Sequence, residues 1–526
     1  MRRYARAVGR QLPAALAVGL TLIPIAYLVI RAFGASSDSW GRLLDWNTAQ
    51  LLVNSLGLAF AVTLACMVIA LPYAWLVTQS DLPGRRIFAT LGPLPLVVPS
   101  YVGALMFVAA FGPRGLTQQA LEHPLGIEAL PPIYGFFGAF VTLTAFTYPY
   151  VLLTLTAAFR RLDHTQIEAA RGLGASPLKA FRKAGLPQLR PALFSGGLLC
   201  ALYVLSDFGV VSIMRFDTFT RAIYVSYRSF FDREGAALLS LVLVLVTVLV
   251  VLAYFKLRGD SRRQTVTAAG AQRPRTTQLG RWRYLGLAFC GGVLLIALVT
   301  PAVVLGYWLV VGGNNQAMAS SLLDAVIGSV SASGLAAILA TALAVPIAYT
   351  AARSSGLLSR ALEVVTTAGF ALPGIVVALG LVFFATRFAL VLYGTLLLLV
   401  LAYVIRFLPQ VIGSSRSAFV RADPQLEEAA RGLGLSPRRA FFKVTLPLAA
   451  PGVLVGTMLV FLTAMKELPA TLILKPIGFE TLATRVWASA QSASYSDAAI
   501  PALILIAISA IPLFISGSDH VDPGSH

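Results

Sequence analysis

Residues 236–256, AALLSLVLVLVTVLVVLAYFK, contain no charged side chain before the final lysine. A run of about 20 apolar residues is long enough to cross the hydrocarbon core of a bilayer as an α-helix. Backbone amides in lipid must be satisfied within the segment, and a run of this length does so as a helix rather than as a barrel strand. The stretch therefore predicts a membrane-spanning helix.

Other apolar runs along the chain pass the same test, which gives twelve predicted spans in total. Because all of them are long enough for helices, we predict an all-α polytopic membrane protein. The predicted spans lie at about 12–33, 50–78, 88–111, 134–158, 190–213, 236–256, 284–311, 321–351, 363–386, 389–412, 449–474 and 498–515.

The composition supports this fold class. The chain has 526 residues, of which 57% are hydrophobic and 12% charged, where a soluble domain has about 45–50% and about 25%. These values exclude a soluble enzyme and a disordered chain. Cys66, Cys200 and Cys290 sit singly inside apolar runs, so no disulfide framework is expected either.

The positive charge indicates which side of the membrane each loop faces. The chain carries 41 Lys and Arg against 22 Asp and Glu, a net charge of +19. Loops on the cytoplasmic side of a membrane protein are rich in Lys and Arg, so we attribute the charge to topology and expect no nucleic acid partner. If the N-terminus is cytoplasmic, 29 of the 41 basic residues fall on the inner side, in segments 1–11, 79–87, 159–190, 256–283, 352–362 and 413–447.

The domain organisation follows from the most polar stretch, residues 257–283, which we expect to be a cytoplasmic linker. It separates a first half of six spans, residues 1–256, from a second half of six spans, residues 284–516. The last ten residues, 517–526, have no Lys or Arg, and we expect them to be a tail added for expression.

The two halves are copies of one pattern. The sequence EAARGLG at 168–174 recurs at 428–434, an offset of 260 residues, which also matches Phe219 with Phe479. Nearer the start of each half the offset is 274 residues, as between Ser55 and Ser329. Since equivalent positions are six spans apart, an even number, the halves have the same orientation and form a parallel repeat.

Each repeated loop, residues 160–190 and 420–450, is predicted to hold two short helices. In the first copy, Asp163 caps a helix that Gly172 and Gly174 end. Ser176-Pro177 then begins a second helix, which Leu186-Pro187 stops before the next span. A turn of a few residues would suffice to connect two spans, so we interpret each loop as a rigid knob presented to a cytoplasmic partner.

The loops resemble the cytoplasmic coupling loop of binding-protein-dependent ABC importer permeases, through the pattern Glu-Ala-Ala, Gly and Leu-Pro at the family's spacing. The resemblance implies the fold of a type I ABC importer, in which these loops dock on an ATPase. The residues that it assigns to ATPase coupling are Glu168, Ala169, Ala170 and Gly174 in the first copy, and Glu428, Ala429, Ala430 and Gly434 in the second.

The chain itself contains no phosphate-binding sequence of the form GxxxxGK[ST]. We therefore expect it to bind no cofactor and to be a transport subunit, not an enzyme. ATP and Mg²⁺ are expected on two separate cytoplasmic ABC ATPase subunits, one for each loop.

Two alternative functions are a secondary transporter driven by an ion gradient, which leaves the repeated loop unexplained, and a membrane-embedded enzyme, for which we find no metal cluster or nucleophile–base pair.

Two carboxylates at equivalent positions are candidates for the substrate path. Asp207 and Glu467 both follow the span after the repeated loop, and a charged residue at membrane depth is a candidate functional residue. Together with the phenol of Tyr148 they would suit a hard cation such as ferric iron, although no metal ligand is firmly assigned. In the alternative interpretation the two carboxylates pair with basic groups, or cap helices broken at Gly209 and Pro469.

Residues 466–486, KELPATLILKPIGFETLATRV, most resemble the ferric-iron permeases of this family. The resemblance implies a periplasmic binding protein that delivers ferric iron to a permease in the bacterial inner membrane. Four arginines between 215 and 233 would equally suit an anion, so thiamine, a phosphonate or a sugar phosphate are alternative substrates.

Overall fold

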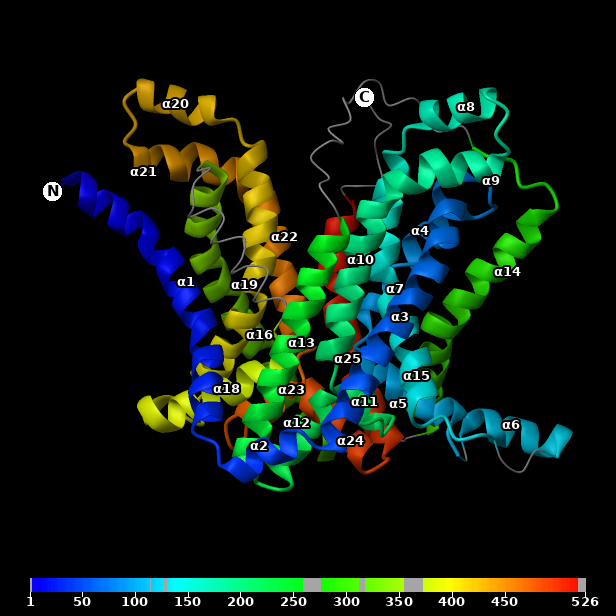
Figure 1. The fold of residues 1–526 in the computed structure, drawn as a ribbon, viewed down its shortest axis with the longest axis horizontal. Coiled ribbons are helices and arrows are strands. Elements are labelled where there is room, and N and C mark those ends of the chain that lie inside the picture. Colours follow the sequence, from blue (N-terminus) through cyan, green and yellow to red (C-terminus); the bar gives the residue numbers. More distant parts are fainter. Residues whose placement is uncertain are drawn as a thin grey trace. The chain divides into compact units, whose positions relative to one another are not determined.

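The computed structural model describes residues 2–113, 115–126, 130–258, 276–311, 317–353 and 372–518 (Figure 1). Four predicted features fall partly outside the described residues. They are most of the linker 257–283, most of the inner-side segment 352–362, the first part of the span 363–386 and most of the tail 517–526.

The described residues form helices, with one isolated backbone bridge between Ser80 and Thr277. Among them, eight helices are long and apolar enough to cross a membrane, and ten if each of two bent helix pairs counts as one span. Two shorter apolar helices, Gly374–Phe388 and Tyr495–Ile511, follow the same composition. Each of the twelve predicted spans overlaps one of these helices or bent pairs, so the predicted all-α membrane fold is confirmed.

The chain divides into two compact units. The first-loop unit consists of Trp46–Arg221 and Val246–Gly312 and contains the first repeated loop. Its helices are α3 (Trp46–Gln79), α4 (Arg85–Leu91), η1 (Leu94–Val97), α5 (Ser100–Phe111), α6 (Leu116–Leu125), α7 (Phe136–Arg160), α8 (His164–Gly172), α9 (Pro177–Ala180), η2 (Phe181–Gly185), α10 (Leu186–Ser206), α11 (Gly209–Ile213), α14 (Trp282–Leu294), η4 (Leu295–Val299) and α15 (Thr300–Val311).

The second-loop unit consists of Met1–Asp45, Ala222–Leu245 and Gly313–His526 and contains the second repeated loop. Its helices are α1 (Arg2–Phe33), α2 (Ser37–Leu43), α16 (Ala317–Arg353), α18 (Gly374–Phe388), η5 (Leu390–Leu392), α19 (Leu396–Arg421), α20 (Pro424–Gly432), α21 (Pro437–Ala440), η6 (Phe441–Thr445), α22 (Leu446–Met465), α23 (Pro469–Leu474), α24 (Leu482–Gln491) and α25 (Tyr495–Ser518). The chain crosses from one unit to the other within α12 (Phe219–Arg228) and again within α13 (Arg233–Arg258).

The repeat predicted from the sequence is visible in the order of the elements. From α7 to α11 the first-loop unit runs through a long helix, two short helices, a π-helical turn, a second long helix and a five-residue helix. The second-loop unit repeats this order from α19 to α23. The order of the helices around each repeated loop is therefore the same in both units.

A bundle of three long helices forms the centre of each unit: α3, α7 and α10 in one, and α16, α19 and α22 in the other. Equivalent glycines let two of the helices approach closely. A methyl group on Gly196 of α10 would lie 2.7 Å from Cα of Val151, and one on Gly456 of α22 would lie 2.9 Å from Cα of Val411. Small residues at such crossings allow the backbone contact on which helix packing in a membrane depends.

The first helix of each half packs in the unit that contains the loop of the other half. In the second-loop unit, Tyr27 of α1 lies 6.1 Å from Phe383 of α18, measured between ring centroids. In the first-loop unit, Phe289 of α14 lies 6.5 Å from Tyr73 of α3 by the same measure. The compact units therefore differ in composition from the sequence halves 1–256 and 284–516, although the sequence repeat itself holds.

The start of α1 lies at the same end of the second-loop unit as α20 and α21 (Figure 1). This relation concerns that unit alone. It means that the N-terminus and the second repeated loop face the same side of any membrane that the unit crosses.

Candidate functional site

The first repeated loop begins with a capped helix. The carboxylate of Asp163 accepts a hydrogen bond of 2.9 Å from the backbone N–H of Thr165, at the start of α8. The hydrogen bonds from Thr165 hold the pKa of Asp163 below its usual value. Asp423 caps α20 in the same way, through the N–H of Gln425. The predicted caps are therefore both present.

Each of these helices ends in a Schellman motif, in which two backbone bonds close around a residue of positive φ. Gly174 has a φ of 86°, its N–H donates to the carbonyl of Arg171, and the N–H of Ala175 donates to the carbonyl of Ala170. Gly434, with a φ of 93°, repeats both bonds 260 residues later. Gly172 stays helical, so of the two glycines predicted to end the helix only Gly174 supplies the left-handed residue.

The helix after the glycine turn does not stop at the Leu-Pro pair, and this prediction was wrong. α9, the π-helical turn η2 and α10 form one continuous helix from Pro177 to Ser206, which passes through Pro187. Proline has no N–H to donate and crowds the preceding turn. The turn before it widens accordingly, with the N–H of Leu186 bonded to the carbonyl of Phe181 five residues earlier.

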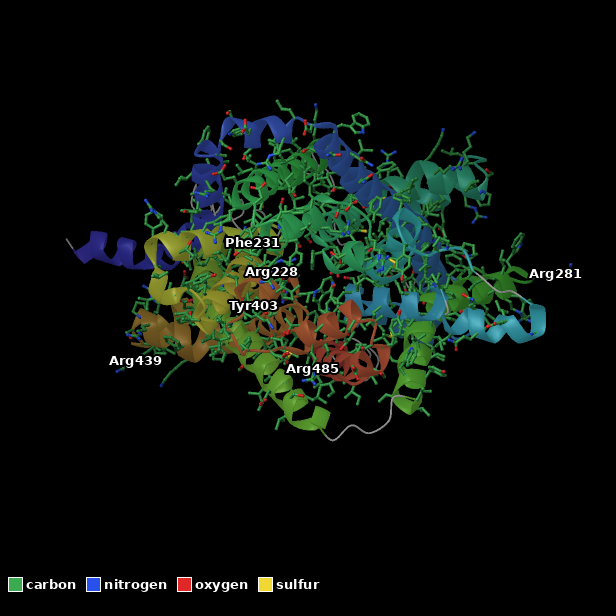
Figure 2. The ribbon with its side chains drawn as sticks, turned by 90° about the horizontal axis from the view of Figure 1, so that it is seen from below. Arg228, Phe231, Arg281, Tyr403, Arg439 and Arg485 are labelled. Carbon is green, nitrogen blue, oxygen red and sulfur yellow. The ribbon has the colours of Figure 1, made fainter. Side chains whose placement is uncertain are left out.

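Most of the predicted coupling residues lie on the surface. Glu168 and Ala169 of α8 are exposed, as are Glu428 and Ala429 of α20, whereas Ala170 is half-buried and Ala430 buried. Arg439 of α21 extends away from the helices of its unit (Figure 2). Each loop thus presents part of a short helix to its surroundings.

A feature that sequence reasoning missed is an apolar side chain at the end of each helix. Leu173 is 90% exposed and Leu433 is 88% exposed. A single exposed leucine is ordinary on a protein surface, but here one lies at the equivalent position of both loops, where it can make an apolar contact with a partner. The sequence signal was the Leu between the two glycines of EAARGLG, present in both copies.

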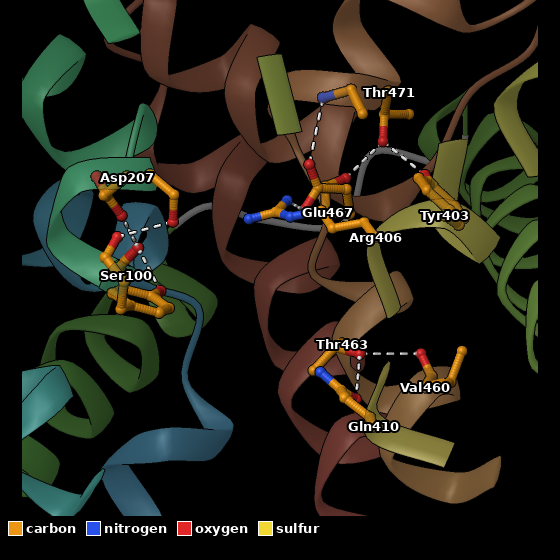
Figure 3. A network of polar contacts seen from close by, with 12 residues as sticks. Ser100, Asp207, Tyr403, Arg406, Gln410, Val460, Thr463, Glu467 and Thr471 are labelled. Atoms are coloured by element: carbon orange, nitrogen blue, oxygen red, sulfur yellow. Dashed lines mark hydrogen bonds and ion pairs between the residues drawn. The ribbon is translucent and has the colours of Figure 1, made fainter. Parts of the chain in front are cut away.

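In the first-loop unit, Asp207 stabilises the start of a broken helix. It is buried, and its Oδ1 accepts a hydrogen bond of 2.8 Å from the N–H of Val210, in the first turn of α11. Its Oδ2 accepts one of 2.6 Å from the hydroxyl of Ser100, which in turn accepts one of 3.0 Å from Tyr203 (Figure 3). Thr220 donates to its backbone carbonyl.

In the second-loop unit, Glu467 occupies the equivalent position with different partners. It is buried and forms an ion pair with Arg406 of α19 (Figure 3). Its Oε1 accepts a hydrogen bond of 3.3 Å from the N–H of Ala470, in the first turn of α23. Tyr403 and Thr471 share a hydrogen bond of 2.6 Å beside it.

The two carboxylates therefore do what the alternative interpretation predicts. Asp207 and Glu467 each cap a short helix at the predicted breaks, and Glu467 in addition pairs with a basic group. Their partners differ because Phe146 occupies the position of Arg406, and Ser100 that of Gly374, in the first half. Whether either carboxylate contacts substrate stays a prediction.

Tyr148 is not part of the Asp207 network. Its buried hydroxyl donates a hydrogen bond of 2.7 Å to the carbonyl of Gly92, at the end of α4. Within the described residues, no group of three or more His, Cys, Asp or Glu side chains could hold a metal ion. The residues predicted for a ferric-iron path thus lie in separate hydrogen-bond networks.

The repeat offset changes again beyond these carboxylates. Ser55 accepts a hydrogen bond of 3.1 Å from the N–H of Phe219, and the equivalent Ser329 accepts one of 2.7 Å from the N–H of Leu482. Phe219 and Leu482 are the first residues of α12 and α24. The predicted match of Phe219 with Phe479 was therefore wrong by three residues, because the loop before α24 is longer.

Comparison with known proteins places this geometry in context. The family "Binding-protein-dependent transport system inner membrane component" matches residues 78–263 and 344–518. The two matches contain the two repeated loops, one each.

Relatives differ in the substrate that their names carry. The Fe(3+)-transport system permease protein FbpB 2 of Haemophilus influenzae is 32% identical over 507 residues, which cover 95% of this chain and 96% of that protein. The putative 2-aminoethylphosphonate transport system permease protein PhnU of Salmonella paratyphi A is 33% identical over 164 residues, 30% of this chain and 56% of that protein. The sulfate transport system permease protein CysT of Salmonella typhimurium is 27% identical over 257 residues, 47% of this chain and 90% of that protein.

Proposed function

The chain belongs to the family of binding-protein-dependent transport system inner membrane components, and we propose that it imports ferric iron at the expense of ATP hydrolysed by partner subunits. It is an ABC importer permease, a multi-pass inner membrane protein and a transport subunit, not an enzyme. The family sets aside the alternatives of an ion-driven secondary transporter and a membrane-embedded enzyme.

The proposed partners on the cytoplasmic side are two ABC ATPase subunits that bind ATP and Mg²⁺. The surfaces that support them are α8 and α20, with Glu168 and Glu428 exposed and Leu173 and Leu433 almost fully in solvent. An exposed apolar side chain beside a charged one is suited to a protein groove, since the partner buries the leucine and pairs the carboxylate. The hydrogen-bonded caps of α8 and α20 support a role for these helices in transmitting movement from the ATPase.

In the proposed cycle, ATP binding closes the two ATPase subunits and draws the two loops together. The two units then rock to open toward the periplasm, accept iron from a docked binding protein, and reset after hydrolysis. In this proposal the repeated loops and the N-terminus both face the cytoplasm. The position of α1, which begins at the same end of its unit as α20, supports that orientation (Figure 1).

The observation that carries the iron assignment is the relative named for Fe(3+) transport, which matches 95% of this chain. The phosphonate relative, one of the predicted alternatives, matches 30%. The proposal does not rest on Asp207, Glu467 or Tyr148, because each of these side chains already has a structural role.

The test is reconstitution of the chain in vesicles with its ATPase and its periplasmic binding protein. We expect iron-loaded binding protein to raise the rate of ATP hydrolysis several-fold and iron to accumulate inside. Stimulation by a binding protein loaded with an organic phosphate, but not with iron, would overturn the iron assignment and leave the transporter in place.

A charge-reversal variant tests the coupling loops in the same system. Glu168→Lys with Glu428→Lys should release the ATPase from the membrane or abolish stimulated hydrolysis, because a positive side chain then replaces the carboxylate that faces the partner's groove. The matched control is Glu122→Lys, an exposed glutamate on α6 outside both loops. Normal assembly and transport in the double variant would contradict the assigned role of the loops.

A further inference from the structure

The two repeated loops are held to their units by different chemistry. In the second loop, Glu427 precedes the predicted coupling residue Glu428 and is 8% exposed. The hydroxyl of Tyr349 lies 2.8 Å from its Oε1 and 3.1 Å from its Oε2, and the hydroxyl of Thr445 donates to Oε2 over 2.7 Å. A buried carboxylate is costly unless its oxygens accept hydrogen bonds, and here two hydroxyls supply them.

These three residues come from three elements. Glu427 lies on α20, Thr445 ends the π-helical turn η6, and Tyr349 lies near the end of α16. The carboxylate therefore joins both arms of the loop to a helix that is distant in sequence.

The side chain of Tyr349 is itself held in place by neighbouring groups. The ring of Tyr349 packs against Phe441 and Phe419, with centroids 4.9 and 5.7 Å away. One turn further along α16, Arg353 donates a hydrogen bond of 3.1 Å to the carbonyl of Ala422, at the end of α19 just before α20 begins. Tyr349 thus has little freedom to follow Glu427 if α20 moves away alone.

The first loop has none of these three polar groups at the equivalent positions. Ile167 replaces Glu427, Gly185 replaces Thr445, and Trp75 replaces Tyr349. A methyl group at Gly185 would lie 3.2 Å from Cδ1 of Ile167, so the space that the hydroxyl of Thr445 uses in the second loop is here closed by an apolar side chain. The first loop has a polar contact of another kind: the side chain of Gln188 on α10 accepts a hydrogen bond of 3.0 Å from the N–H of Asp163 and donates one of 3.3 Å to its carbonyl. Gln188 therefore joins the two arms of the first loop to each other, whereas Glu427 joins both arms of the second loop to α16.

α16 continues this connection to the opposite end of its unit. Twenty residues before Tyr349, about 30 Å along an α-helix, the hydroxyl of Ser329 accepts the hydrogen bond from the N–H of Leu482 at the start of α24. Arg485 of α24 donates a further one of 2.8 Å to Ser321 of α16. The helix α16 is thus hydrogen-bonded to α20 near one end and to α24 near the other.

We propose that Glu427 is a positioning residue that locks the second coupling loop, but not the first, to α16, so that a displacement of α20 moves α16 and α24 with it. The proposal rests on the proposed function only for the identity of the partner that displaces α20. The lock itself can be measured in the chain alone.

The experiment measures hydrogen–deuterium exchange of the full chain in lipid nanodiscs, first without ATPase subunits. Loss of a buried acceptor leaves two hydroxyls unsatisfied, and we expect Glu427→Ala to speed exchange in residues 426–433 about tenfold. Tyr349→Phe, which keeps the ring packing, should produce a smaller increase in the same residues, and Glu427→Gln, which keeps one acceptor oxygen, should fall between wild type and Glu427→Ala. The control is Tyr307→Phe on α15, whose side chain is partly exposed.

Exchange in residues 164–172 of the first loop should not change in any of these variants. Wild-type exchange of α20 in Glu427→Ala, or an equal increase in α8, would overturn the proposal, because the first means no lock and the second means general destabilisation.

The second arm uses the reconstituted transporter with ATPase and binding protein. We expect Glu427→Ala to increase the ATP hydrolysed per substrate imported several-fold, with partial rescue by Glu427→Gln. An unchanged ratio in Glu427→Ala would overturn the proposed transmission through α16. If the wild-type chain shows no ATP-driven import, the proposed function fails, and the exchange measurement still decides whether Glu427 locks the loop.

Discussion

The guanidinium of Arg406 forms an ion pair with the carboxylate of Glu467 next to Gly374, where a methyl group would collide with both side chains. In the first half the three equivalent positions hold Phe146, Asp207 and Ser100. One half thus neutralises its buried carboxylate with a cation, and the other satisfies it with a hydroxyl. The two solutions differ at the neighbouring position, where Gly374 leaves room for the guanidinium and Ser100 supplies the hydroxyl.

The ion pair predicts that its members depend on each other. Arg406→Met alone leaves the carboxylate of Glu467 buried without its counter-charge and should cost about 3–5 kcal/mol of stability. Arg406→Met combined with Glu467→Gln should recover much of this, since no charge is then buried. The measurement is denaturant unfolding of the purified protein in detergent micelles. A double variant less stable than Arg406→Met would contradict this account of the pair.

The helix cap at Asp207 predicts a graded loss. Asp207→Ala removes the acceptor for the N–H of Val210 and the hydroxyl of Ser100, and should destabilise the protein by about 1–3 kcal/mol. Asp207→Asn keeps one acceptor oxygen and should cost less. The melting temperature of each variant measures the difference, and equal temperatures for Asn and Ala would argue against a cap.

The Schellman motif predicts opposite effects at two neighbouring glycines. Gly174→Ala forces a side chain into a left-handed backbone conformation and should cost about 1 kcal/mol. Gly172→Ala is the matched control, because this residue is helical with no neighbouring atom within 4 Å of the added methyl group. It should be neutral or stabilise the helix slightly. Gly434→Ala and Gly432→Ala repeat the comparison in the second loop, and protection of α8 or α20 from hydrogen exchange measures each pair.

Close packing of α22 on α19 predicts intolerance to a single methyl group. Gly456→Ala would place it 2.9 Å from Cα of Val411 and should cost about 1–3 kcal/mol as the helices are forced apart. Gly413→Ala on α19, with nothing within 4 Å of the new methyl group, is the control. Thermal unfolding distinguishes the two, and equal stability would mean that the crossing is looser than the distance indicates.

Much of the fold could be predicted from the sequence, because lipid imposes a simple rule on apolar runs. The spans, the repeat and the capped helices at Asp163 and Asp423 follow from local composition and spacing. The continuation of the helix through Pro187 could not be predicted, since it depends on how a π-helical turn absorbs the missing donor. The exchange of first helices depends on tertiary packing, to which a single sequence gives no access.

The candidate site could be predicted from the sequence only in part. A repeated motif reveals Glu168 and Glu428, but the roles of their neighbours depend on contacts between distant segments. Nothing in the sequence distinguishes Glu427 from an exposed glutamate, and its role follows only from its distances to Tyr349 and Thr445. The choice of Tyr148 as a companion of Asp207 rested on its position in the chain, whereas folding brings Ser100 and Tyr203 there instead.

The exchanged first helices have a consequence for how the molecule is assembled during synthesis. The helix α1 leaves the ribosome first, yet its aromatic partner Phe383 on α18 is translated more than 350 residues later. Until α18 has been synthesised, α1 lies in the membrane without the helix that carries Phe383. Were the gene divided between residues 259 and 275, the first product would carry α1, which packs in the second-loop unit, and the second product would carry α14 and α15, which pack in the first-loop unit. A single reading frame delivers both in equal number and in the same place.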